Sequence, residues 1–139
     1  MRYYLAYGSN MVIEQMNIRC PESKFIKTEK LYGYELIFKR TREGVYLDLI
    51  KSDKKNYVPV VIWEISENDE KNLDEYEDVP LSYLKKEIDC SIGKALVYIM
   101  ANKWTKEEIP EDKYFLPILK TYEENKFDEN ILIKNLGGI

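Results

Sequence analysis

The fold begins with the stretch Tyr3-Tyr4-Leu5-Ala6-Tyr7-Gly8-Ser9-Asn10, near the start of the sequence. Its first five residues are aromatic or apolar throughout, which is typical of a short buried strand. Gly8 ends that strand because glycine adopts backbone angles that other residues avoid. We expect Ser9 or Asn10 to cap a helix over residues 11–17. Free N–H groups at such a corner suit a carboxylate or phosphate, although a plain capped turn would also explain these residues.

Further strands and helices are predicted along the rest of the chain. The helix over residues 11–17 directs Met11, Met16 and either Ile13 or Ile18 toward the core. Segments rich in β-branched and aromatic residues predict strands at 25–31, 34–39, 45–50, 57–65, 83–90 and 94–101. Polar and apolar residues alternate over 45–49, as in a half-buried strand. Later helices are expected from Ser66 to about Glu77, over 112–125, and from Asp128 through Leu136, and Pro117 fits only in a first turn.

The order of these elements favours one class of fold. Strands do not alternate strictly with helices, so a doubly wound α/β fold is disfavoured. We therefore expect a single α+β domain over residues 1–139, with the sheet curled into a small barrel.

Composition excludes several classes of function. The chain has 139 residues and no His, so a Ser-His-Asp relay, a Cys-His relay and an imidazole zinc site are impossible. The net charge of −4 argues against a nucleic-acid partner. The longest apolar run, residues 95–101, is far shorter than the ~20 residues of a membrane helix. The first seven residues lack the length of a signal peptide. We expect a cytoplasmic protein with no membrane association and no metal site.

An acidic segment at residues 74–78 carries the clearest candidate for chemistry. At about 100° per residue of helix, Glu77 lies about 40° from Leu73. It therefore shares the inward-facing stripe of Leu73 and Tyr76. Burial and acidic neighbours would raise the pKa of Glu77 toward neutral, as a general acid/base requires. A solvated acidic helix end is the alternative interpretation.

Three motifs in this sequence resemble those of the γ-glutamylcyclotransferases and their AIG2-like relatives. They are Tyr4-Leu5-Ala6-Tyr7-Gly8-Ser9-Asn10, the strand at 60–65 followed by residues 73–77, and Tyr114-Phe115-Leu116. The resemblance implies a small mixed barrel flanked by helices. It also implies a cyclising transferase or lyase, in which the substrate's α-amine attacks its γ-amide carbonyl and releases 5-oxoproline and an amine. No cofactor and no metal are implied, and the partner is a small γ-glutamyl molecule.

The resemblance also assigns roles to individual residues. Glu77 matches the catalytic glutamate, which would move a proton from the α-ammonium to the leaving amine. The substrate-binding residues implied by the same motifs are Tyr7, Gly8, Ser9, Asn10, Tyr83 and Tyr114. The corner at Gly8 would hold the substrate's α-carboxylate through backbone N–H groups.

Two positions depart from the family pattern. Asp78 stands where the family has Gly after the glutamate, and its charge would raise the pKa of Glu77 further or distort the site. The Gly expected within residues 122–126 is also missing. These departures keep open a non-catalytic module that binds a small carboxylate on the same fold. A tailoring enzyme that removes a γ-glutamyl protecting group is a further alternative. The leaving amine or amino acid and the oligomeric state stay open.

Overall fold

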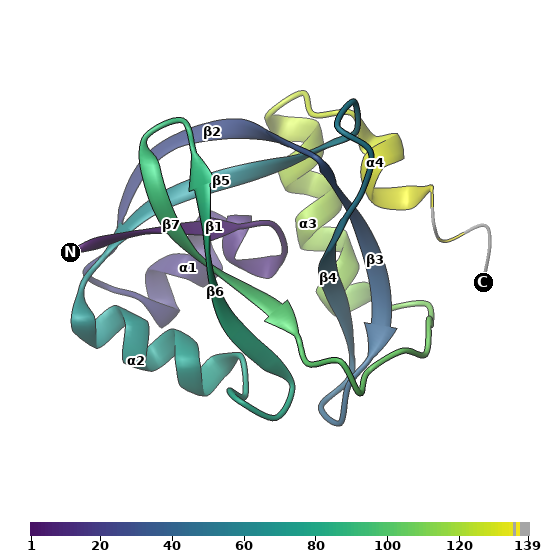
Figure 1. Cartoon of the computed structure of the whole chain (residues 1–139), viewed down its shortest axis with the longest axis horizontal. Helices are drawn as coiled ribbons and strands as arrows, with labels where there is room; N and C mark the ends of the chain where they lie inside the picture. The colour runs from purple at the N-terminus through teal and green to yellow at the C-terminus, as the bar shows by residue number, and fades with distance from the viewer. Residues whose placement is uncertain (135, 137–139) are drawn as a thin grey trace.

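The computed structural model describes residues 1–134 and 136 and shows two β-sheets with helices packed around them (Figure 1). The larger sheet has the order β2-β5-β1-β7-β6, and β3 pairs with β4 in a separate sheet. The strands are β1 (Arg2–Ala6), β2 (Lys24–Tyr32), β3 (Tyr34–Arg40), β4 (Val45–Lys51), β5 (Tyr57–Ile65), β6 (Tyr83–Cys90) and β7 (Gly93–Met100). The helices are η1 (Ser9–Met11), α1 (Ile13–Arg19), α2 (Glu67–Tyr76), α3 (Asp112–Glu124) and α4 (Glu129–Ile133). This architecture confirms the predicted α+β class.

Strand β1 occupies the middle of the larger sheet. It runs antiparallel to β5 and parallel to β7, so both of its edges are paired. Tyr4, Leu5 and Ala6 are buried, as a central strand requires. The chain leaves this strand at Tyr7 and Gly8, and the predicted corner therefore lies inside the fold rather than at a sheet edge.

The β3–β4 hairpin closes the barrel from one side (Figure 1). Only Gly33 separates β2 from β3, and its φ of 88° lies in the left-handed region that favours glycine. Asp48 on β4 accepts a hydrogen bond from the N–H of Met100 on β7 at 2.9 Å, and it pairs with Lys39 at 2.7 Å. Asp48 is thus buried, which corrects the alternation predicted for 45–49. Asp48 faces inward because its carboxylate joins β4 to β7, two strands that do not pair with each other in the described residues.

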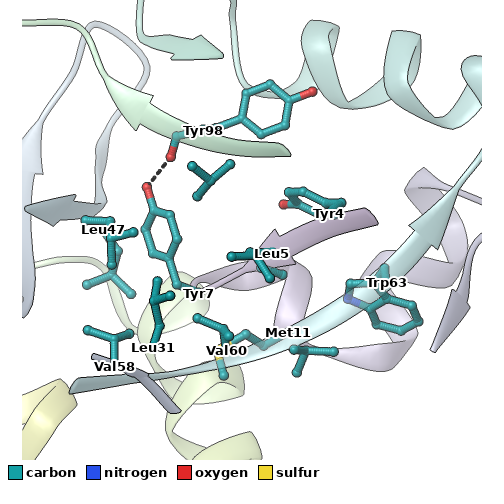
Figure 2. Close-up of a cluster of buried hydrophobic side chains, with 14 of the residues drawn as sticks. Tyr4, Leu5, Tyr7, Met11, Leu31, Leu47, Val58, Val60, Trp63 and Tyr98 are labelled. Carbon is teal, nitrogen blue, oxygen red and sulfur yellow. Dashed lines mark hydrogen bonds between the residues drawn. The ribbon is translucent and has the colours of Figure 1, made fainter. Parts of the chain in front are cut away.

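A cluster of buried side chains fills the space between the two sheets and the helices (Figure 2). Trp63 on β5 is its largest fully buried member. The indole N–H of Trp63 donates to the carbonyl of Asn10 at 3.0 Å. The core therefore fixes the backbone of the corner as well as the strands.

The segment after the corner differs from the helix predicted over residues 11–17. A short 3₁₀ turn, η1, comes first, and α1 begins only at Ile13 without a side-chain cap from Ser9 or Asn10. Met11 and Met16 are buried as expected, but Ile13 and Ile18 are 54% and 82% exposed. The expectation for the isoleucines was wrong because the 3₁₀ turn shifts the phase of the following helix.

The later helices follow the prediction with two differences. Pro117 is the sixth residue of α3 and not part of its first turn. Its carbonyl accepts a hydrogen bond from the Thr121 hydroxyl at 3.1 Å. Helix α4 begins after Asp128 as expected and ends at Ile133, and the predicted continuation to Leu136 crosses residue 135, outside the described residues. Within the described chain, none of the helices combines the length and apolar character needed to cross a bilayer.

Candidate active site

A cavity of about 360 Å³ lies between the corner after β1, the end of α2 and the β3–β4 hairpin. Residues from several distant segments form its wall. All the residues predicted for the site are among them: Tyr7, Gly8, Ser9, Asn10, Glu77, Tyr83 and Tyr114. The fold thus brings together residues that the sequence separates by more than a hundred positions.

Glu77 lies at the C-terminal end of α2. The helix begins with a capping box formed by Ser66 and Asp69, and the buried Leu73 anchors it. The N–H of Glu77 donates to the Leu73 carbonyl at 2.8 Å, so the last turn holds its backbone. Within residues 1–134 and 136, the Glu77 carboxylate has no hydrogen-bond or ion-pair partner. Burial raises the pKa of Glu77 to about 8, and the nearby charge of Arg19 opposes that rise.

The neighbours of Glu77 differ from expectation. Tyr76 is 41% exposed instead of facing the core, and its hydroxyl is hydrogen-bonded to Ser9 Oγ at 3.0 Å. Asp78 accepts two hydrogen bonds from Arg42, both at 2.7 Å. This pairing lowers the pKa of Asp78 to about 2. The sequence-based idea that Asp78 raises the pKa of Glu77 is therefore wrong, because a guanidinium neutralises its charge and burial is the cause of the rise.

The corner at residues 8–10 supplies backbone donors. Among the described residues, the N–H groups of Gly8, Ser9 and Asn10 donate no hydrogen bond. The corner leads into the 3₁₀ turn, so the anion-binding potential rests on these free groups and not on the dipole of an α-helix. A Cβ on Gly8 would lie 3.1 Å from the Tyr114 hydroxyl, so any larger residue at this position would crowd that hydroxyl.

Internal partners hold the side chains of Ser9 and Asn10. Arg19 Nη1 donates to Ser9 Oγ at 3.1 Å and to Asn10 Oδ1 at 2.6 Å. Asn10 Nδ2 donates to the Tyr4 hydroxyl at 3.0 Å. These side chains therefore shape the corner, while its backbone stays free. Sequence reasoning missed Arg19, because an arginine in the last turn of a short helix is usually a solvated surface residue.

The three predicted tyrosines are held in different ways. Tyr7 donates to the carbonyl of Tyr98 at 2.6 Å, as the dashed line in Figure 2 marks. Tyr83 donates to the carbonyl of Leu47 at 2.6 Å. The Tyr114 hydroxyl instead accepts from the Leu47 N–H at 3.0 Å, so its own proton remains available. Burial raises the pKa of all three phenols, which are therefore neutral near pH 7.

The cavity wall carries acidic side chains, and Arg42, which does not line the cavity, pairs with two of them, Glu43 and Asp78. The charged side chains lining it, among described residues, are all acidic: Glu43, Glu75, Glu77 and Asp78. In the same part of the chain, no group of three or more His, Cys, Asp or Glu side chains converges to hold a metal.

Comparisons with known proteins concern the family and the fold of this chain. Residues 4–116 match the family described as gamma-glutamyl cyclotransferase, AIG2-like. A solved structure named gamma-glutamyl cyclotransferase is similar with a TM-score of 0.75 and 23% identity, over 90% of this chain and 80% of that chain. An uncharacterized human protein is similar with a TM-score of 0.73 and 23% identity, over 89% and 79% of the two chains. An uncharacterized protein from Pyrococcus horikoshii gives 0.58 and 16%, over 88% and 98%. These structural similarities concern the fold, and by sequence alone no curated protein matches significantly.

Proposed function

The chain belongs to the gamma-glutamyl cyclotransferase, AIG2-like family, and from this membership we propose that it cleaves γ-glutamyl amides to 5-oxoproline and a free amine. One observation carries the proposal. Glu77 presents an unpartnered carboxylate with a raised pKa to the same cavity as the free N–H groups of Gly8, Ser9 and Asn10. A base and an anion-binding corner are the two features that a cyclising substrate needs.

Glu77 acts as general base and then as general acid in the proposed reaction. Its pKa of about 8 is close to the ~8 of an α-ammonium group, so a proton passes between them at little cost. The freed α-amine attacks the γ-carbonyl carbon and forms the lactam C–N bond. The leaving nitrogen takes the proton from Glu77 as the original γ-amide C–N bond breaks. The regenerated Glu77 carboxylate then accepts the second proton from the new ring nitrogen and passes it to the amine, which leaves as an ammonium ion. The products contain all the atoms of the substrate, so the balance needs no water, oxidant or cofactor.

The remaining residues orient the substrate in this proposal. The N–H groups of the corner bind the α-carboxylate, and the free O–H of Tyr114 donates to the substrate. Tyr7 and Tyr83 shape the cavity wall and do not donate to the substrate, because their hydroxyl protons are already bound to backbone carbonyls. Holding the amine against its own carbonyl supplies most of the rate enhancement, since the nucleophile belongs to the substrate.

The acidic wall favours one class of leaving group. A γ-glutamyl amino acid would bring a second carboxylate beside Glu43 and Glu75, and no lining residue in the described chain offers it a cation. A γ-glutamyl amine lacks that carboxylate, and a terminal ammonium on it would be attracted to the wall. We therefore propose γ-glutamyl amines as the preferred substrates.

A substrate panel tests the reaction. Purified protein is incubated with γ-glutamyl amines and γ-glutamyl amino acids, and 5-oxoproline is measured. We expect Glu77→Gln to lower kcat by about 10²–10⁴-fold, the usual contribution of a general acid/base. Glu67→Gln is the matched control, because Glu67 is an exposed acid on the same helix that does not line the cavity.

Each outcome of the panel has a definite meaning. Turnover that survives Glu77→Gln would contradict the assigned role of Glu77. If no compound is turned over and a γ-glutamyl compound still raises the unfolding temperature, the chain is a binding module instead of an enzyme.

A further inference from the structure

Arg19 lies behind the cavity wall and contacts both parts of the site. It is the last residue of α1 and does not itself line the cavity. Its guanidinium carbon lies 3.7 Å from the centre of the Tyr76 ring, and Nη1 donates to Ser9 and Asn10. Nη2 donates to Gln15 at 2.9 Å, which holds the orientation of the guanidinium plane.

These contacts join two segments that are far apart in the sequence. Ser9 and Asn10 supply the corner, and Tyr76 directly precedes Glu77. The hydrogen bond between Ser9 Oγ and the Tyr76 hydroxyl completes a closed ring of contacts with Arg19. A planar guanidinium can stack on an aromatic ring and donate along its edge at the same time, which an ammonium cannot do.

We propose that Arg19 is a positioning residue that fixes the Gly8–Asn10 corner relative to the Tyr76–Glu77 end of α2. The inference rests on the proposed function, because it concerns the spacing between the group that binds the α-carboxylate and the carboxylate that moves the proton. Arg19 touches neither the substrate nor the reacting atoms. A misplacement of about 1 Å between such groups lowers the rate by about 10²-fold.

Arg19 also provides the charge that acts on Glu77. Phenols face Glu77 from the surrounding elements: Tyr4, Tyr7, Tyr46, Tyr76, Tyr83, Tyr98 and Tyr114. Burial raises the pKa of each of them, so they are neutral near pH 8. Of the acids on the cavity wall, Asp78 is paired with Arg42, and Glu43 and Glu75 are exposed. Removing the charge of Arg19 should therefore raise the pKa of Glu77.

Two substitutions separate the charge of Arg19 from its shape. Arg19→Gln removes both, and Arg19→Lys keeps the charge but loses the planar fork. We expect Arg19→Gln to lower kcat/KM by about 10–100-fold and to move the acid limb of its pH profile to higher pH. Arg19→Lys should keep the acid limb and lower kcat/KM, because the charge remains and the spacing between the corner and Glu77 changes. The pKa of Glu77 is also measured directly, by carbon NMR of the carboxyl group in the free protein.

Arg2→Gln is the matched control. Arg2 joins β1 to Glu70 on α2 and to Glu87 on β6, away from the cavity. Arg2→Gln removes the same charge as Arg19→Gln and a comparable set of contacts. A general effect of lost charge or lost stability would therefore appear in both variants. We expect Arg2→Gln to change neither the acid limb nor KM.

The outcomes distinguish this inference from the proposed function. If folded Arg19→Gln keeps the wild-type pKa of Glu77 and the wild-type kcat/KM, the inference is wrong. If Arg19→Gln does not fold, Arg19→Lys decides, and an unchanged kcat/KM in that variant overturns the inference. If the wild type turns over no γ-glutamyl compound, the proposed function fails. The NMR titration of Glu77 then still shows whether Arg19 acts on that carboxylate.

Discussion

Burial raises the pKa of Glu77 from its ordinary value of 4.5 to about 8. A carboxyl group with this property binds its proton more tightly in the folded chain than in the unfolded chain. Between pH 4.5 and 8 the folded state therefore carries more protons, and its stability falls as the pH rises through that window. The same burial that makes Glu77 a suitable acid/base thus destabilises the fold at alkaline pH.

This linkage predicts how Glu77→Gln affects stability. Glutamine keeps the shape of the side chain and cannot ionise, so the variant should be more stable than the wild type by on the order of 2–3 kcal/mol at pH 9. The gain should shrink toward zero below pH 4.5, where the carboxyl is protonated in both the folded and the unfolded chain. Urea unfolding at pH 4 and pH 9 measures both values. Glu67→Gln corrects for the change in net charge, and an equal gain at both pH values would contradict the prediction.

Helical spacing predicted the direction of one side chain at the end of α2 correctly and that of its neighbour wrongly. Helical spacing was enough to direct Glu77 inward, because Leu73 fixes the buried face one turn earlier. The same spacing failed for Tyr76, whose ring lies under the guanidinium of Arg19 instead of in the core. The position of the Tyr76 ring is set by its contact with Arg19 on α1. The periodicity of α2 alone cannot predict a contact with another helix.

At the scale of elements, helices α2 and α3 end in the same way. Each is followed by a non-glycine residue with positive φ, Asp78 at 55° and Lys126 at 58°. The next N–H reaches back across the turn, from Val79 to Asp74 at 3.1 Å and from Phe127 to Tyr122 at 2.9 Å. This is the Schellman arrangement, in which glycine is the favoured residue. The two positive-φ residues thus lie in the two segments where the sequence departs from the expected family pattern, position 78 and residues 122–126.

Lys126→Gly should therefore stabilise the chain. Removing the Cβ relieves the strain of the left-handed backbone at residue 126. The greater freedom of glycine in the unfolded chain offsets part of this gain, so we expect the free energy of unfolding to rise by roughly 1 kcal/mol. This corresponds to a rise in Tm of about 3–4 °C. Thermal unfolding measures it, and Lys126→Ala, which keeps the strain, should show no rise. A Tm that rises equally in both variants would mean that loss of the lysine side chain is the cause.

Most strands could be predicted from sequence because turn residues delimit them. Gly33 separates β2 from β3, and residues 41–44, which include Gly44, separate β3 from β4. The 3₁₀ turn η1 could not be predicted, because three residues are too short to show a period. The separate sheet formed by β3 and β4 could not be predicted either. Alternation of polar and apolar residues indicates which face of a strand is buried but not which strands lie beside it.

At the scale of the whole molecule, the site depends on how the two sheets are held together. The open edge of β4 meets the cavity at Leu47, whose N–H and carbonyl bind the hydroxyls of Tyr114 and Tyr83. The next residue, Asp48, bonds to the backbone of β7. The family motifs predicted residues that line one cavity, but the closure of the two sheets depends on long-range contacts that no local pattern records.

Asp48→Asn tests whether this closure supports both the fold and the site. The asparagine oxygen can still accept from Met100, but its amide group faces the ammonium of Lys39, which lies 2.7 Å from the Asp48 carboxylate. Breaking one side of a buried ion pair leaves an uncompensated charge, so we expect a loss of about 3 kcal/mol in urea unfolding. Adding Lys39→Met should recover part of that loss, because it removes the stranded charge. At a temperature where the variant stays folded, displacement of Leu47 should raise KM through Tyr114. An unchanged KM together with the loss of stability would show that Asp48 supports the fold alone.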